Sequence, residues 1–236
     1  MARSECYHRA VSRALDAVLL DLGGTLDGRS GWRERFHRHF TACRLADVYP
    51  FESRVRAFDH AEERSHAAGD MTGVGLRDLL RMHIAWQFES LGGARPDTES
   101  AIVDRFVADT EQACAISRDV LAALARRGYR LGVVSNGCGN VAALCAEYGF
   151  TPFLSVVVDS HVLGCAKPDP AIMRHALARL EADPARTAFV GDSIDRDIEP
   201  AKALGLRTVW VSDGRTSASP AIDVAIDSIA ELPGSL

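Results

Sequence analysis

The chain has 236 residues, of which 47% are hydrophobic and 25% charged, proportions typical of a globular protein that buries a substantial core without disulfide bonds. The formal net charge of −5 gives no basic excess that would favour nucleic acid as a partner, and no apolar stretch approaches the ~18 residues that a membrane span needs. Before Asp21 the chain contains no uninterrupted apolar stretch of the ~7–15 residues that a secretory signal needs. We therefore expect no secretory signal, no membrane partner and a cytoplasmic location.

Six short apolar runs, rich in Val and Leu, recur along the chain and are mostly bounded by Gly, Asp or Ser. Runs of this kind are typical of buried parallel strands. They are Ala17–Leu22, Leu131–Val134, Val156–Val158, Ala188–Val190, Thr208–Val211 and Val224–Ile226. Six scattered Cys without a CxxC pair fit reduced thiols that lie mostly in the core.

Helix signals lie between the later runs. Ser117 can cap a helix that stops at Gly128, and a second amphipathic stretch stops at Gly149. Asp169 followed by a proline is a start signal for a third helix, and residues 197–204 fit a fourth. Strands alternating with helices predict a doubly wound α/β fold with a parallel, Rossmann-like sheet.

Residues 28–115 interrupt this alternation. Helical stripes of apolar residues replace the β-branched runs here, and they include Trp32, Phe36 and Phe40, then Leu76, Leu79, Leu80, His83, Ile84 and Phe88, then Ile102, Val103, Phe106, Val107 and Thr110. We therefore predict an α/β core made of residues 1–27 and 116–236, with an all-helical domain inserted at 28–115.

Chemically capable side chains follow the predicted strands. Ligands of open parallel sheets bind at the carboxyl ends of the strands, so these residues are expected to converge there. A cation and several carboxylates at one edge suggest a hard divalent ion, most simply Mg²⁺ bridging protein and phosphate. The residues lie in four segments: Asp21 in LLDLGGTLDG, Ser135 and Asn136 in VVSNG, Lys167 in CAKPDP, and Asp192, Asp195 and Asp197 in FVGDSIDRD.

With these four motifs in this order, the chain resembles the haloacid dehalogenase superfamily of hydrolases, which are mostly phosphatases. The core resemblance covers roughly residues 15–28 and 116–230, and the helical insert stands where that superfamily has its helical cap. The resemblance implies that Asp21 is a nucleophile that forms an aspartyl-phosphate, and that Lys167 neutralises the charge on Asp21 and on the phosphoryl oxygens.

The resemblance also implies a phosphate site and a metal site. The phosphate site would comprise Gly24, Thr25, Ser135, Asn136 (through its backbone amide) and Lys167. The Mg²⁺ site would comprise Asp21, the carbonyl of Gly23, Asp192 and Asp197, of which Asp197 would position metal-bound water or Lys167. Asp195 fits a solvated turn as well as a ligand.

The chain departs from the family pattern at Gly23, where phosphatases of the superfamily have a second Asp that protonates the leaving oxygen and then activates water. General acid–base catalysis contributes ~10²–10⁴-fold, so this residue bears directly on turnover. Asp27, His37 and His39 are other possible proton carriers, although the two His also fit a solvated helix face.

The insert offers further candidates for substrate contact. Five Arg lie between Gly28 and Arg44, and Arg29 or Arg33 could recognise a distal anionic group, although a charged helix face is the more ordinary reading. Trp32 could line the pocket or pack within the insert.

The sequence thus predicts a Mg²⁺-dependent hydrolase, a phosphatase of a small phosphorylated metabolite that is slow if nothing replaces the missing acid/base. The alternative is a catalytically weakened relative that binds phosphorylated ligands or has a regulatory role. A haloacid dehalogenase is disfavoured because Asp192 and Asp197 keep an acidic metal site. The Schiff-base hydrolases of the superfamily are excluded because the only Lys residues are Lys167 and Lys202, outside the insert. Substrate identity and oligomeric state do not follow from the sequence.

Overall fold

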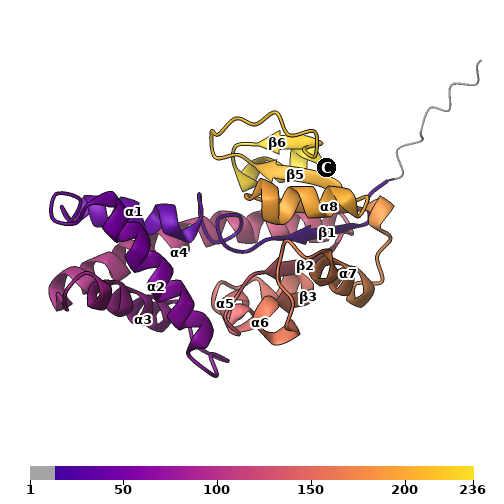
Figure 1. Ribbon diagram of the computed structural model, residues 1–236. Coiled ribbons are helices and arrows are strands. Elements are labelled where there is room, and N and C mark those ends of the chain that lie inside the picture. The colour runs from indigo at the N-terminus through magenta and orange to yellow at the C-terminus, as the bar shows by residue number, and fades with distance from the viewer. Residues whose placement is uncertain (1–13) are drawn as a thin grey trace, which may run out of the picture.

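One parallel sheet of six strands forms the centre of the computed structural model, which describes residues 14–236 (Figure 1). The strand order is β3-β2-β1-β4-β5-β6. The strands are β1 (Ala17–Leu20), β2 (Arg130–Ser135), β3 (Leu154–Asp159), β4 (Thr187–Gly191), β5 (Arg207–Val211) and β6 (Val224–Ile226). Each coincides with a predicted run to within two residues at either end. Cys6 and most of the stretch considered for a secretory signal lie outside the described residues.

Helices cover both faces of the sheet, which confirms the doubly wound α/β fold. Alternate residues of β1 face opposite sides: Val18 and Leu20 pack in the cluster that includes apolar residues of α4 and α5, whereas Ala17 and Leu19 pack with those of α7 and α8. The covering helices are α4 (Pro96–Arg126), α5 (Val141–Glu147), α7 (Pro170–Arg179) and α8 (Glu199–Ala203).

The predicted helical insert follows β1. It consists of α1 (Trp32–Ala42), α2 (Phe51–Ala67), α3 (Leu76–Ser90) and the first part of α4. Figure 1 shows α1, α2 and α3 to one side of the sheet, with α4 running from them towards it. The three predicted apolar stripes lie on α1, α3 and α4, whereas α2 was not predicted. The division at 27/28 and 115/116 stays a prediction, and its second boundary falls within α4.

Two helix predictions were wrong in detail. Ser117 does not cap a helix, because the apolar stripe continues unbroken from Ile102 to Leu124 and α4 is therefore one 31-residue helix. Ser117 is buried within it, and its hydroxyl donates to the carbonyl of Leu26 at 2.7 Å. Residues 197–204 are divided between a π-helical turn, Ile194–Ile198, and α8.

The other predicted helix boundaries are confirmed. Gly128 follows α4 with a φ of +86°, and Gly149 follows α5 with a φ of +73°. Asp169 caps α7, its side chain accepting from the amide of Ala171 at 2.8 Å. The remaining short helices are α6 (Ser160–Leu163) and α9 (Leu232–Ser235), with 3₁₀ turns at Thr151–Phe153, Pro184–Arg186 and Ile229–Glu231.

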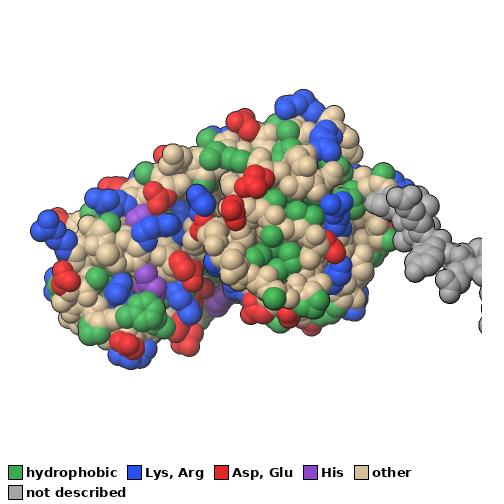
Figure 2. Space-filling model, turned by 90° about the horizontal axis from the view of Figure 1, so that it is seen from above, with side chains coloured by type: hydrophobic (Ala, Val, Ile, Leu, Met, Phe, Trp, Pro, Cys, Tyr) green, Lys and Arg blue, Asp and Glu red, His purple; other side chains and the backbone are tan. Residues whose placement is uncertain are grey.

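Within residues 14–236 no helix is both long and apolar enough to cross a membrane. On the face seen in Figure 2, acidic and basic side chains are interspersed rather than gathered into one large patch of either sign. Among the described cysteines, Cys114, Cys138 and Cys145 are buried, Cys43 and Cys165 are half-buried, and all five are free thiols.

Candidate active site

The candidate residues meet at the carboxyl edge of the sheet because β2, β1 and β4 are neighbours. Asp21 follows β1, Ser135 ends β2, and Asp192 follows β4. The chain extends the sheet from β1 to β2 and β3 on one side and then returns to β4 on the other. Such a reversal leaves a crevice at the strand ends, where ligands of open α/β sheets bind.

Lys167 connects two of the carboxylates. Its Nζ donates to Asp21 Oδ1 at 2.6 Å and to Asp197 Oδ1 at 2.7 Å, and all three side chains are buried. Burial by itself lowers the pKa of Lys167, but the charges of Asp197 and Asp21 outweigh it and raise the pKa above the ordinary value. The ammonium is therefore charged at neutral pH, and it lies beside the predicted nucleophile.

Asp21, Asp192 and Asp197 form a buried acidic triad whose ligand oxygens lie within 4.8 Å of one another. Burial, reinforced by Asp21 and Asp197, raises the pKa of Asp192 to about 7. Burial also raises the pKa of Asp197 to about 6, against the opposing charge of Lys167. Carboxylates this close need a cation to ionise together, and oxygen ligands suit Mg²⁺. Asp195 instead accepts a hydrogen bond from Ser193 Oγ at 2.5 Å.

The loop after β1 turns tightly beside the triad. Gly24 has a φ of +82°, and a Cβ there would lie 2.8 Å from Asp192 Oδ2, so a side chain is excluded on both grounds. Thr25 Oγ1 donates to Asp21 Oδ2 at 3.3 Å. Ser135 is buried and lines the same cavity. The structure therefore brings the predicted phosphate-site residues together around Asp21.

Asn136 makes a contact that the sequence did not predict. Its Nδ2 donates to the carbonyl of Lys167, and its Oδ1 accepts from the amide of Lys167, both at 2.8 Å. The Asn136 side chain thus fixes the backbone that carries the lysine. The two residues are 31 positions apart in different loops, so a single sequence gives no signal of the pairing.

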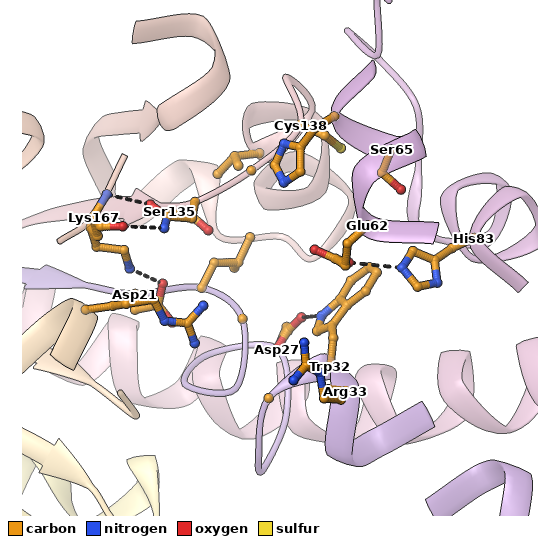
Figure 3. Close-up of a pocket in the computed structure, with 18 of the residues that line it drawn as sticks. Asp21, Asp27, Trp32, Arg33, Glu62, Ser65, His83, Ser135, Cys138 and Lys167 are labelled. Carbon is orange, nitrogen blue, oxygen red and sulfur yellow. Dashed lines mark hydrogen bonds and ion pairs between the residues drawn. The ribbon is translucent and has the colours of Figure 1, made fainter. Parts of the chain in front are cut away.

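A cavity of about 840 Å³ lies between these residues of the core and the helical insert (Figure 3). Ser135, Lys167 and the acidic triad lie on its core side. The insert side includes residues of α1, α2 and α3, among them Trp32, Arg33, Asp59, Glu62 and His83. The sequence left two roles open for Trp32, and the structure shows both: its side chain lines the cavity and packs against Phe36 and Phe106 within the insert.

Gly23 lines the cavity without filling it. A Cβ there would meet Trp32 Cδ1 at 3.9 Å and nothing closer, so the space that a second Asp would occupy is open. Asp27 also lines the cavity, but its carboxylate accepts from the Gly24 amide and from Trp32 Nε1, both at 2.8 Å. His37 and His39 are not among the lining residues.

The two Arg candidates are both ion-paired. Arg29 is exposed and paired with Asp213 at 2.6 Å, away from the cavity lining. Arg33 lines the cavity and is paired with Asp59. Sequence reasoning missed Glu62 and His83, which face the cavity as a hydrogen-bonded pair.

Comparisons with known proteins agree with this arrangement. The family model described as "Hydrolase: haloacid dehalogenase-like hydrolase" matches residues 15–205. A phosphoglycolate phosphatase from Cupriavidus necator is 37% identical over 121 residues, 49% of this chain and 52% of that protein. A phosphoserine phosphatase from Thermus thermophilus is 34% identical over 101 residues, 42% of this chain and 41% of that protein. The matched segments span about half or less of these relatives.

Solved structures share the fold at low sequence identity. A HAD phosphatase from Thermococcus onnurineus superposes with a TM-score of 0.58 at 21% identity, covering 94% of this chain and 97% of that one. An L-2-haloacid dehalogenase from Xanthobacter autotrophicus gives 0.56 at 17% identity, covering 93% and 97%. At these identities the likeness establishes the fold alone. With the family model matched over most of its length, the chain belongs to the haloacid dehalogenase-like hydrolases.

Proposed function

We propose that this chain is a Mg²⁺-dependent phosphatase of a small phosphorylated metabolite, acting through an aspartyl-phosphate on Asp21. The observation that carries the proposal is the buried ammonium of Lys167, which joins Asp21 to Asp197 beside Asp192 at the core side of a cavity. This arrangement presents a carboxylate nucleophile with positive charge next to the oxygens that a phosphoryl group would place there.

The proposed reaction has two steps at phosphorus. A carboxylate oxygen of Asp21 attacks phosphorus as the bond to the ester oxygen breaks, and that oxygen takes a proton from solvent. Water then attacks the aspartyl-phosphate, the bond from phosphorus to Asp21 breaks, and its electron pair restores the carboxylate. Lys167 stays charged throughout and stabilises the phosphoryl oxygens together with Ser135 and the Asn136 amide.

The acidic triad, with the Gly23 carbonyl, would hold the Mg²⁺. When bound, the ion neutralises charge on the phosphoryl oxygens and lets the carboxylates ionise together. The buried oxygens within 4.8 Å and the raised pKa values of Asp192 and Asp197 support this fit.

Two features support a small phosphate ester as the substrate. The cavity of about 840 Å³ is roofed by the helical insert, which leaves room for a metabolite-sized ligand. The relatives from C. necator and T. thermophilus are named for phosphoglycolate and phosphoserine, both small phosphate monoesters. A dehalogenase is disfavoured because the chain keeps the acidic triad.

Gly23 supports the second candidate function, a relative that binds phosphorylated ligands with little turnover or has a regulatory role. Gly23 supplies no carboxylate for proton transfer, and general acid–base catalysis raises the rates of enzymes by ~10²–10⁴-fold. The second candidate requires that no other group performs that transfer.

The test is phosphate release from a panel of small phosphate monoesters and p-nitrophenyl phosphate, with Mg²⁺ and with EDTA. We expect Mg²⁺-dependent release that is abolished in Asp21→Asn and in Lys167→Met. Lys202→Met is the matched control, because Lys202 is the other lysine and pairs with Asp223 at the surface. Circular dichroism checks that each variant folds. If the folded wild type releases no phosphate from any ester, the proposal is wrong, and release by Gly23→Asp alone then supports the second candidate.

A further inference from the structure

On the insert side of the cavity, three polar side chains form a hydrogen-bonded chain, here called the relay: Glu62, His83 and Gln87. Glu62 on α2 accepts from or donates to His83 on α3, with Oε1 and Nε2 3.0 Å apart, and His83 Nδ1 lies 2.9 Å from Gln87 Nε2. His83 is 1% exposed, whereas the Glu62 side chain is 41% exposed. Figure 3 shows the Glu62 carboxylate between His83 and the core side of the cavity.

The relay fixes both the ring and its proton. His83 stacks parallel on Phe36, with ring centroids 4.8 Å apart at 8°, and meets the edge of Trp32. Because the Gln87 amide donates to Nδ1, the ring proton is placed on Nε2, which then donates to Glu62. One oxygen of Glu62 is thereby engaged and the other is left for the cavity.

The proposed reaction determines on which side of the cavity the group that accepts the proton of water must lie. In-line displacement at phosphorus sends the leaving oxygen away from Asp21, and the attacking water arrives along the same line. That side faces the insert. Gly23 offers no group there, and the nearest atom to its absent Cβ is Trp32 Cδ1 at 3.9 Å.

Two other carboxylates that line the cavity, those of Asp27 and Asp59, are less suited. Asp27 is held by Gly24 and Trp32 and lies 3.5 Å from Arg35. Asp59 is paired with Arg33. Glu62 alone among these carboxylates is both reachable from the cavity and oriented by a buried histidine.

Resting on the proposed phosphatase function, we propose that Glu62 is a catalytic residue that replaces the carboxylate missing at position 23, and that His83 is its positioning residue. Glu62 takes a proton from the water that attacks the aspartyl-phosphate, as the bond from phosphorus to Asp21 breaks. The protonated Glu62 then releases that proton to solvent, and the leaving oxygen of the first step takes its proton from solvent, so each turnover returns Glu62 to the carboxylate form.

The electrostatics of Glu62 agree with the role of base. Burial would raise its pKa, but the hydrogen bond from His83, together with nearby positive charge such as that of Arg33, outweighs burial and holds the pKa below its ordinary value. The carboxylate form that accepts a proton is therefore the resting form at neutral pH.

The test is Glu62→Gln in two backgrounds, wild type and Gly23→Asp, with p-nitrophenyl phosphate, whose leaving group departs without a proton. In the wild-type background we expect kcat to fall by about 10²–10⁴-fold. We also expect a burst of nitrophenolate and an aspartyl-phosphate that accumulates, because only the hydrolysis step is slowed. In the Gly23→Asp background the loss should largely disappear, because the carboxylate introduced at position 23 supplies the base.

Glu52→Gln, on the same helix and exposed, is the matched control and should turn over as wild type. His83→Gln should lower kcat in the wild-type background and have no further effect on kcat beside Glu62→Gln. Full turnover by Glu62→Gln overturns the inference and leaves the proposed function standing. An inactive wild type beside an active Gly23→Asp variant overturns the inference and supports the second candidate function, a relative with little turnover. If the wild type and Gly23→Asp are both folded and inactive, the proposed function itself fails.

Discussion

Lys167 is held at both ends: its ammonium lies between Asp21 and Asp197, and its backbone is paired with the Asn136 side chain. The ion pairs join residues that the motifs predicted. The Asn136 pairing was not predictable, because it depends on how two loops 31 residues apart meet above the sheet. Motif residues are predictable when each follows its own strand, whereas contacts between loops are not.

Asn136→Asp tests the backbone contact. The new carboxylate cannot donate to the carbonyl of Lys167 and places negative charge against it, so the lysine shifts relative to Asp21. We expect turnover to fall on the order of 10²-fold, the cost of misplacing a catalytic group by about 1 Å. Steady-state kinetics measure the loss, and thermal melting shows that the fold persists. Wild-type turnover would show that the contact does not position Lys167.

Asp192 should make the metal-free protein sensitive to pH. Its pKa is raised to about 7, chiefly by burial and then by Asp21 and Asp197, above the ordinary value of ~3.9. The folded state therefore binds more protons than the unfolded state between these values. Its contribution to stability is full below about pH 4 and is lost as the pH rises through about 7.

In EDTA we expect the free energy of unfolding to fall between about pH 4 and pH 7, on the order of a few kcal/mol. Mg²⁺ should restore it. Asp192→Asn should flatten the dependence only in part, because the pKa of Asp197 is also raised, to about 6. Urea titrations at each pH measure this. A metal-free protein that gains stability across this range would contradict the electrostatic account of the triad.

At the scale of elements, periodicity predicted most of the strands and helices but not α2. The buried face of α2 consists of Arg54, Ala57, Phe58, Ala61 and Ser65, so small and polar residues stand where a large apolar stripe would be recognised. The pairing of Glu62 with His83 depends on the packing of α2 against α3 and was invisible for the same reason. The continuity of α4 was missed because Ser117 resembles a cap while its hydroxyl bonds to Leu26.

Arg35 joins three elements where the insert meets the core. Its guanidinium is fully buried, donates to the carbonyl of Asp27 at 3.2 Å and to Thr110 Oγ1 at 2.5 Å, and lies 3.9 Å from the centroid of Phe106. The Arg35 guanidinium also forms a buried ion pair with the Asp27 carboxylate, at 3.5 Å. Removing the guanidinium leaves the charge of Asp27 buried without its partner. We therefore expect Arg35→Ala to lower the free energy of unfolding by about 3–5 kcal/mol.

Urea unfolding of Arg35→Ala beside Arg38→Ala checks this, because Arg38 lies on the same helix and is exposed. The control should change stability little. Equal losses in the two variants would mean that the buried network does not hold the junction together.

At the scale of the whole molecule, the insert also contacts the α/β core where α3 begins. Glu147 of α5 accepts from the amide of Leu76 at 2.8 Å, at the start of α3, and Asn140 donates to the carbonyl of Val74 at 3.0 Å. α3 has no side-chain cap of its own, so the core supplies the negative charge that its N-terminus favours.

Glu147→Gln should loosen this contact. A charge at a helix N-terminus contributes about 0.3–1 kcal/mol, so hydrogen exchange at the Leu76 amide should quicken by roughly two- to fivefold. Glu181→Gln is the control, because Glu181 is exposed and lies elsewhere on the α/β domain. Unchanged exchange at Leu76 would show that the carboxylate does not hold α3 against the core.

The central claim is that Asp21 carries the phosphoryl group. The most direct measurement is acid quenching during turnover with Mg²⁺ and a phosphate monoester, followed by peptide mass spectrometry, in the wild type, Glu62→Gln and Asp21→Asn. The account predicts one phosphoryl group on Asp21, more of it in Glu62→Gln, and none at that position in Asp21→Asn. Phosphate release with Asp21 never modified, or release by Asp21→Asn at the wild-type rate, would contradict it.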